Sequence, residues 1–136
     1  MELFKVGEIA KEVGINVETL RYYEKIKLMP KPKRIESRYR IYDVSDLRRL
    51  RFIVRAKELG FTLKEIHELL SLKIEKSSTC GDVKHIAEHK LDDIKKRISD
   101  LNSMQNILEK LIDQCTNEEL STDVCPILEV IDEKFQ

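Results

Sequence analysis

The spacing of apolar residues near the start of the chain predicts two short helices. Apolar side chains recur at helical intervals between Val6 and Val13. Gly14 follows, where a tight turn can require a positive φ, and Asn16 suits the N-cap of a second helix over Val17–Glu24. Because two helices and a turn fit into about twenty residues, the pattern predicts a helix-turn-helix arrangement.

A basic loop and a short strand come next. Residues 30–34 read Pro-Lys-Pro-Lys-Arg, and residues 38–42 alternate as a strand does. We interpret the two segments as a two-stranded wing. Residues 31–40 carry five Lys and Arg, with Tyr39 and Tyr42 interleaved. Cations and phenolic hydroxyls suit contacts with phosphate, although a solvated basic loop would have the same composition.

Two further helices are predicted after the wing. Ser45 suits the N-cap of a helix over Asp46–Leu59, and Thr62 suits the cap of another over Leu63–Leu72. Their apolar positions are most simply explained as core. A polar, serine-containing hinge at 75–79 follows.

The stretch Asp82–Gln114 reads as one long amphipathic helix. A helix of this kind would leave its apolar stripe exposed to water, so a partner is expected, and a second copy of the chain is the simplest one. The stripe consists of Ala87, Leu91, Ile94, Ile98, Leu101, Leu108, Leu111 and Cys115.

The end of the chain combines a polar loop with a short helix. The loop spans Thr116–Val124 and holds no histidine. Pro126 fits the first position of a helix that runs to about Glu133. Cys125 would then occupy the N-cap, where the helix dipole favours a thiolate. The predicted fold is mainly α: a winged helix-turn-helix domain at 1–75, a hinge and antiparallel coiled-coil dimerisation helix at 76–115, and a C-terminal loop and helix at 116–136.

Three cysteines are the candidate chemistry of the chain. Cys80 and Cys115 are 35 positions, or five heptads, apart, so they share one face of a coiled coil. They would also be roughly 52 Å apart on one straight helix, at about 1.5 Å per residue. An antiparallel pair of helices brings Cys80 of one chain beside Cys115 of the other, and Cys125 can fold back to the same place. A homodimer would thus hold two identical three-thiol sites.

Thiolates bind soft or borderline metal ions. Zn(II) prefers four ligands, whereas three sulfurs without a fourth side chain suit Hg(II). Cd(II), Pb(II) or Zn(II) remain alternatives if a loop carboxylate or water completes the shell. A purely structural alternative is that the three cysteines are buried as small apolar residues of the core. Against it, Cys80 lies in a polar hinge and Cys125 at the start of a helix.

Composition narrows the possible functions. The net charge of zero conceals a split, because residues 1–76 carry 18 Lys and Arg against 12 Asp and Glu, whereas residues 77–136 carry 7 against 13. Only the basic front half is therefore expected to meet a polyanion. No apolar run approaches a membrane span, and we expect a cytoplasmic protein whose thiols are reduced. The sequence shows no nucleophile–base constellation and no phosphate-binding loop, so we do not expect an enzyme.

The motifs together resemble the MerR family of transcriptional regulators over nearly the whole chain. Residues 5–10, Lys-Val-Gly-Glu-Ile-Ala, resemble the family's first helix, and residues 19–24, Thr-Leu-Arg-Tyr-Tyr-Glu, its recognition helix. Residues 38–42 resemble its wing, and residues 59–66 the segment before the dimer helix. The resemblance implies a homodimer that binds promoter DNA opposite RNA polymerase.

For such a regulator we expect two sets of DNA contacts. Residues that enter or flank the major groove would be Val17, Glu18, Thr19, Arg21 and Tyr22. Residues that grip phosphates would be Tyr23, Arg34, Arg38, Tyr39, Arg40 and Tyr42.

Residues 87–91 and 125–128 are similar to the mercury-sensing branch of the family, which is known for cysteines at the positions of Cys80, Cys115 and Cys125. This implies a repressor and activator of a mercury-resistance operon that acts by distorting promoter DNA. The interval between Cys115 and Cys125 is slightly longer than in that branch. A Cd-, Pb- or Zn-responsive regulator, a thiol redox sensor on the same frame, and a metal buffer or chaperone are the alternatives.

Overall fold

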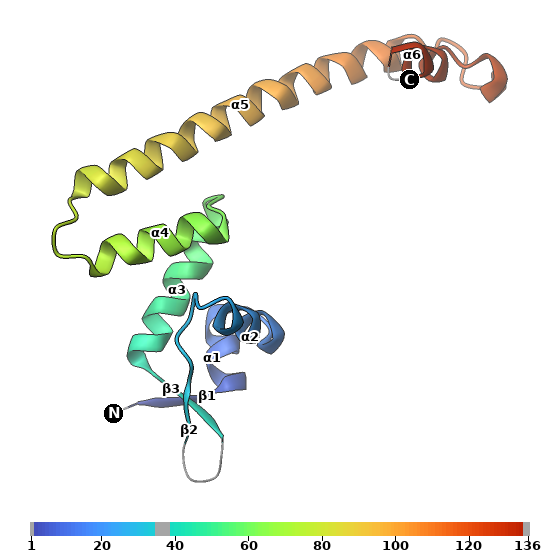
Figure 1. Ribbon diagram of the computed structural model, residues 1–136. Coiled ribbons are helices and arrows are strands. Elements are labelled where there is room, and N and C mark those ends of the chain that lie inside the picture. Colours follow the sequence, from blue (N-terminus) through green and yellow to red (C-terminus); the bar gives the residue numbers. More distant parts are fainter. Residues whose placement is uncertain (1, 35–38, 135–136) are drawn as a thin grey trace. The chain divides into compact units, whose positions relative to one another are not determined.

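The computed structural model describes residues 2–34 and 39–134 of the chain, which are mostly helical (Figure 1). Contacts divide the chain into two compact units, Met1–Lys90 and Leu91–Gln136. The first unit holds the predicted helix-turn-helix and wing. The second holds most of the long helix and the C-terminal segment.

The helix-turn-helix is formed by α1 (Val6–Val13) and α2 (Val17–Lys25), as the apolar spacing predicts. Gly14 closes α1 at φ 78°, in the left-handed region where glycine is favoured. Asn16 caps α2, because its Oδ1 accepts a 2.8 Å hydrogen bond from the backbone N–H of Thr19.

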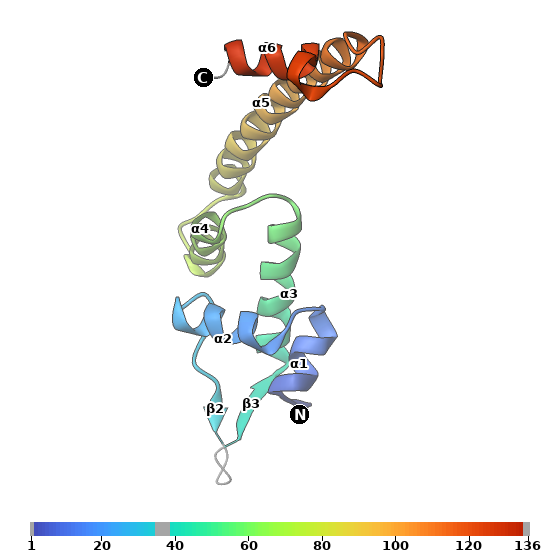
Figure 2. The same ribbon diagram turned by 90° about the vertical axis from the view of Figure 1, so that its right-hand side faces the viewer.

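The wing belongs to a sheet of three antiparallel strands in the order β1-β3-β2, where two strands were expected. The strands are β1 (Leu3–Lys5), β2 (Lys33–Arg34) and β3 (Arg40–Asp43), and Figure 2 shows β2 and β3 side by side. Strand β1 pairs with β3 through Leu3 opposite Asp43. The N-terminal residues thus connect the base of the wing to α1.

The next two helices are α3 (Val44–Glu58) and α4 (Leu63–Ile74). The predicted cap of α3 by Ser45 is wrong. Asp43 caps it instead, with Oδ1 accepting from the N–H of Asp46, whose own carboxylate accepts from the N–H of Asp43, both at 2.9 Å. The predicted cap of α4 is confirmed, because Thr62 Oγ1 accepts from the N–H of Glu65 at 3.1 Å. Both are capping boxes.

One core holds the first unit together. Residues from α1, α2, β3, α3 and α4 are almost completely buried in it. Its fully enclosed side chains include Ile9, Leu20, Leu28, Met29, Tyr42, Leu50, Ile53 and Ile66. This packing fixes α2 and the wing relative to each other.

The long helix α5 (Cys80–Asp113) has 34 residues and is about 51 Å long at 1.5 Å per residue. It starts two residues before the predicted position, because Thr79 and Asp82 exchange hydrogen bonds at its first turn. A 3₁₀ turn (Thr122–Val124) and α6 (Pro126–Lys134) follow.

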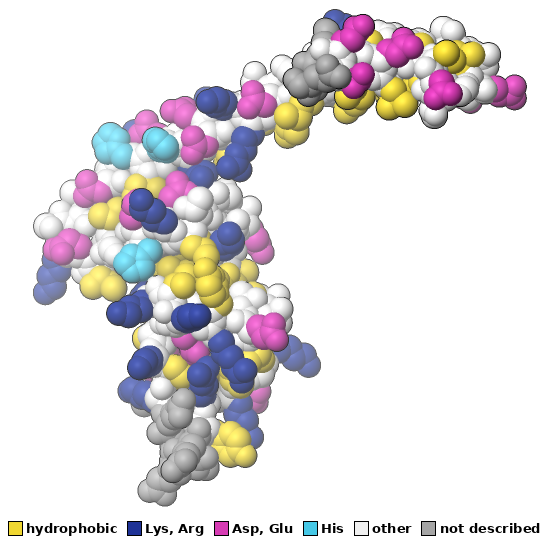
Figure 3. Space-filling view, turned by 45° about the vertical axis from the view of Figure 1, so that its right-hand side comes forward, with side chains coloured by type: hydrophobic (Ala, Val, Ile, Leu, Met, Phe, Trp, Pro, Cys, Tyr) yellow, Lys and Arg dark blue, Asp and Glu magenta, His cyan; other side chains and the backbone are white. Residues whose placement is uncertain are grey.

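Much of the apolar stripe of α5 is exposed in the single chain, and Figure 3 shows apolar side chains along its outer part. Exposed members of the stripe include Leu91, Ile98, Leu101 and Leu108, whereas Leu111 is buried. Met104 and Ile112, outside the predicted stripe, are exposed as well. In the part of the chain that the structure describes, no helix has the length and apolar character needed to cross a membrane.

Candidate nucleic-acid interface and thiol site

Four of the five recognition-helix residues predicted to meet DNA occupy one side of α2, and Thr19 lies off that side and bonds to Asn16. Glu18, Arg21 and Tyr22 are exposed, whereas Val17 and Thr19 are partly buried at the first turn. Positions 17, 18, 21 and 22 lie on one helical face, and Leu20 points the other way into the core. The helix is therefore anchored on one side and open to solvent on the other, which is the arrangement that a groove-reading helix requires.

The wing presents part of the predicted phosphate-binding set. Tyr39 is 67% exposed, and the side chain of Arg40 is 30% exposed. Arg34 lies on β2 with its Cα opposite that of Arg40, but its side chain is outside the described part of the structure. Arg38 also lies outside the described residues.

Two of the predicted phosphate ligands, Tyr23 and Tyr42, lie in the core of the unit. Tyr42 is 0% exposed, and its hydroxyl donates a 2.7 Å hydrogen bond to Oε2 of Glu24. Burial, followed by the bond to Glu24, raises the pKa of Tyr42 well above its usual value. Tyr23 is 7% exposed, and burial raises its pKa also. The hydroxyl of Tyr42 is enclosed and already bonded to Glu24, so its assignment to phosphate binding is wrong. The assignment of Tyr23 remains a prediction.

Glu24 organises the contact between α2 and the wing, a role that the sequence analysis missed. Its Oε1 accepts a hydrogen bond from Nη1 of Arg40 at 2.7 Å, and its side chain is only 7% exposed. Arg40 and Tyr42 are two positions apart on β3 and so share one face of the strand. That spacing is the sequence signal that could have indicated a shared partner.

Two hollows on this unit are lined by further cations. Figure 3 shows several Lys and Arg side chains on one face of the molecule. Arg21 and Arg40 line both hollows, which have volumes of about 400 and 670 Å³. The other cations of their linings are Lys5, Lys11, Lys25 and Lys31. These lysines extend the positive surface beyond the residues that the sequence motifs identified, and such a surface attracts a polyanion.

The three cysteines lie at the two ends of the long helix in sequence. Cys80 is exposed and is the first residue of α5. Cys115 and Cys125 are partly buried free thiols that lie beyond the end of α5 and directly before α6. Among the residues that the structure describes in one chain, no group of three potential metal ligands includes a cysteine.

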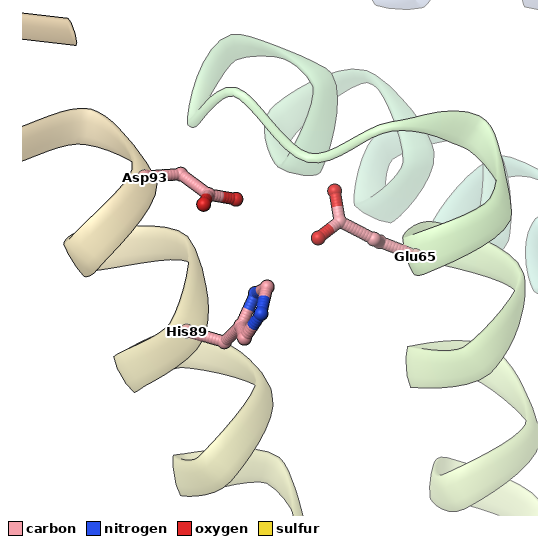
Figure 4. Close-up of side chains that lie close together, drawn as sticks. All are labelled: Glu65, His89 and Asp93. Carbon is pink, nitrogen blue, oxygen red and sulfur yellow. The ribbon is translucent and has the colours of Figure 1, made fainter. Parts of the chain in front are cut away.

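Glu65 of α4 and His89 of α5 point toward each other (Figure 4). Asp93 follows His89 one turn later on the same helix. The carboxylate of Glu65 is already paired with Lys90, whose Nζ lies 2.8 Å from Oε1. A metal ion bound to that oxygen would have to displace the ammonium group, so we assign no metal site here.

Comparison with known proteins identifies the family. Residues 4–73 match the family described as MerR HTH family regulatory protein, and residues 47–111 match the family described as MerR, DNA binding. The chain is 40% identical over 132 residues to the HTH-type transcriptional regulator ZntR of Escherichia coli K12, covering 96% of this chain and 94% of that one. It is 40% identical over 131 residues to the mercuric resistance operon regulatory protein of Bacillus cereus, covering 96% and 98%.

Solved structures agree with this fold. The transcription regulator PbrR691 from Ralstonia metallidurans CH34, in complex with lead(II), superposes with a TM-score of 0.81 at 30% identity over 94% of this chain and 98% of that one. MerR from Bacillus megaterium MB1, in complex with mercury(II), gives 0.73 at 37% identity over 95% and 99%. The chain therefore belongs to the MerR family of helix-turn-helix regulatory proteins, which bind promoter DNA and are transcription regulators, not enzymes.

Proposed function

We propose that this MerR-family protein is a metal-responsive regulator of a mercury-resistance promoter and that Hg(II) is its effector. The observation that carries the proposal is the placement of three free thiols at Cys80, Cys115 and Cys125, on either side of one 34-residue helix. The relatives named for mercuric resistance and for a mercury(II) complex support the same metal.

In the proposed site, Cys80 of one protomer binds the metal together with the partner subunit's Cys115 and the partner subunit's Cys125. A second, equivalent site lies at the other end of the helix pair. Three thiolates form a soft donor set that Hg(II) accepts without a fourth ligand. The loop between Cys115 and Cys125 contains Asn, Glu and Asp but no His, so it offers no nitrogen ligand of the kind that Zn(II) commonly uses.

The dimer in this proposal is formed by α5. The stripe of one protomer exposes Ile98, Leu101 and Leu108, which are apolar residues at helical spacing. Covering them with the same surface of a second copy removes them from water. An antiparallel pair also brings Cys80 to the end of α5 where the partner's two other cysteines lie.

In this proposal, metal binding changes the geometry of the promoter DNA rather than the fraction of promoter to which the protein is bound. The exposed face of α2 reads the major groove, and the wing holds the flanking phosphates through Tyr39 and Arg40. Twofold symmetry of the dimer predicts a pseudo-palindromic operator. Hg(II) would favour the conformation in which DNA is bent and untwisted for RNA polymerase, because it binds that conformation more tightly.

A lead-, cadmium- or zinc-responsive regulator is the second candidate. The structural similarity to a lead(II) complex favours it, and Glu118, Glu119 or Asp123 could supply an oxygen ligand from the loop. Such a site would need one loop carboxylate or a water molecule in addition to the three sulfurs.

A competitive metal titration distinguishes the two candidates. The reduced protein is titrated with Hg(II), Cd(II), Pb(II) and Zn(II) in the presence of a thiol competitor, and sulfur-to-metal charge-transfer absorption is followed. We expect Hg(II) to be retained most tightly, at no more than two ions per dimer. Stronger retention of Cd(II), Pb(II) or Zn(II) would contradict the mercury assignment and favour the second candidate.

A further inference from the structure

Lys90 is a buried cation at the junction of two helices. Its exposed fraction is 5%. Its Nζ lies 2.8 Å from Oε1 of Glu65 on α4 and 6.0 Å from the centre of the Phe61 ring. The ammonium group is thus held by a carboxylate and by an aromatic face.

Glu65 contacts both α4 and α5 through one carboxylate oxygen. The oxygen that pairs with Lys90 also accepts a 2.8 Å hydrogen bond from the backbone N–H of Thr62, which closes the capping box of α4. Figure 4 shows Glu65 projecting from α4 toward α5. Lys90 therefore attaches α5 to the first turn of α4.

The α4 side of this junction is rigidly held. Ile66, next to Glu65, is fully buried, and Leu70 one turn later is nearly so. Both belong to the core that also holds α2 and β3. A force applied to Lys90 is consequently transmitted to the part of the unit that carries the recognition helix.

The α5 side is held loosely before Lys90. Of the ten residues Cys80–His89, Ile86 is partly buried and the others are exposed. Val83 and Ala87 line a hollow of about 620 Å³ together with Phe52 and Leu69, so the segment is not packed tightly against α3 and α4. The ion pair of Lys90 with Glu65 attaches α5 to α4 directly after this segment.

Such a pair is better suited to fixing geometry than to raising stability. Burying a lysine has a desolvation cost that its carboxylate partner largely offsets, and an apolar residue of similar size is often equally stable. A methionine at position 90 could fill the same volume. Methionine cannot form an ion pair with Glu65, however, so it would not fix the position of the start of α5 along α4.

We propose that Lys90 is a positioning residue for the metal response. This inference rests on the proposed function, because it requires a metal bound at Cys80, the first residue of α5. About 15 Å of helix, nearly three turns, separate Cys80 from Lys90. Because the ion pair attaches this segment to α4, metal binding at Cys80 displaces α4 and the DNA-binding core that is packed against it.

The test compares Lys90→Met with Lys90→Arg in the full-length dimer. Three quantities are measured for each variant: operator affinity without metal, Hg(II) stoichiometry by charge-transfer absorption, and the metal-induced increase in transcription. In Lys90→Met we expect metal binding and operator affinity to stay within about threefold, while induction falls about tenfold, within the usual range of allosteric coupling. Lys90→Arg keeps the charge and should retain most of the induction.

Lys84→Met is the matched control, because Lys84 is an exposed lysine six positions earlier on the same helix. It should behave as the wild type. If Lys90→Met fails to fold, Glu65→Gln replaces it, since Gln can still accept the bond from the Thr62 N–H but carries no charge.

Three results would overturn the inference. Full induction in Lys90→Met is the first, and parallel loss of induction with operator binding or metal binding, which would indicate a purely structural role, is the second. An equal loss of induction in Lys84→Met is the third. A wild type that binds none of the metals in its thiol site would instead refute the proposed function, and the wild-type titration reveals that case separately.

Discussion

At the scale of single residues, burial separates side chains that the sequence motif presents as alike. Tyr39 and Tyr42 stand among the same cations, yet one is mostly exposed and the other is completely enclosed. The difference arises because β3 has one face toward α2, where Glu24 accepts bonds from both Arg40 and Tyr42. A buried carboxylate that loses one of these donors is left partly unsatisfied.

Substitution of these tyrosines should therefore have opposite consequences. Tyr42→Phe removes the buried hydroxyl and should lower the free energy of unfolding by about 1–2 kcal/mol, measured by denaturant unfolding. Tyr39→Phe should leave stability unchanged and weaken operator binding. Stability that is lower in Tyr39→Phe than in Tyr42→Phe would contradict the assignment of Tyr42 to the core.

The ion pair of Glu65 predicts a specific pH dependence. The hydrogen bond from Lys90, and next the one from Thr62, lower the pKa of Glu65 from 4.5 to about 2. Since the folded-state pKa is depressed, the stability contributed by this carboxylate is complete above pH 4.5 and is lost as the pH falls toward 2. In Lys90→Met the pKa of Glu65 should rise toward 4.5, as followed by NMR titration of its carboxyl carbon. An unchanged pKa in that variant would show that Lys90 is not its main partner in solution.

At the scale of elements, local signals were sufficient where the partners are close in sequence. Asn16 and Thr62 could be predicted as caps because each bonds a backbone group three residues away. Strand β1 could not be predicted, since its three residues gain strand structure only by pairing with β3, about forty residues later. The cap of α3 was misplaced by two residues because both Asp43 and Ser45 have suitable side chains.

The corrected cap of α3 can be tested directly. Asp43→Ala removes the acceptor for the Asp46 N–H and should destabilise the protein by about 1 kcal/mol in thermal or denaturant unfolding. Ser45→Ala lies inside the helix and should change stability by a few tenths of a kcal/mol at most. The reverse order of the two effects would restore Ser45 as the cap.

At the scale of the whole molecule, the sequence predicted the length of α5 and its apolar stripe because the heptad pattern is long and regular. It did not predict the junction of Lys90 with Glu65, because the two residues are 25 positions apart on different helices. The position of each cysteine relative to α5 was also predictable, since helical rise alone keeps Cys80 away from Cys115. The sharing of one metal site between two chains remains a proposal.

A mixed dimer tests this central proposal most directly. One protomer carries Cys80→Ser, and the other carries Cys115→Ser with Cys125→Ser, each with a different affinity tag so that the mixed species can be purified. If the sites are shared between protomers, one site of the mixed dimer keeps all three thiols and the other keeps none.

The measurement is a titration of the mixed dimer with Hg(II), following charge-transfer absorption against a thiol competitor. We predict one tightly bound ion per mixed dimer, with the same three-thiolate spectrum as the wild type, whereas each parent homodimer lacks that spectrum. Absence of the three-thiolate spectrum from the mixed dimer would contradict a shared site and with it the proposed mechanism.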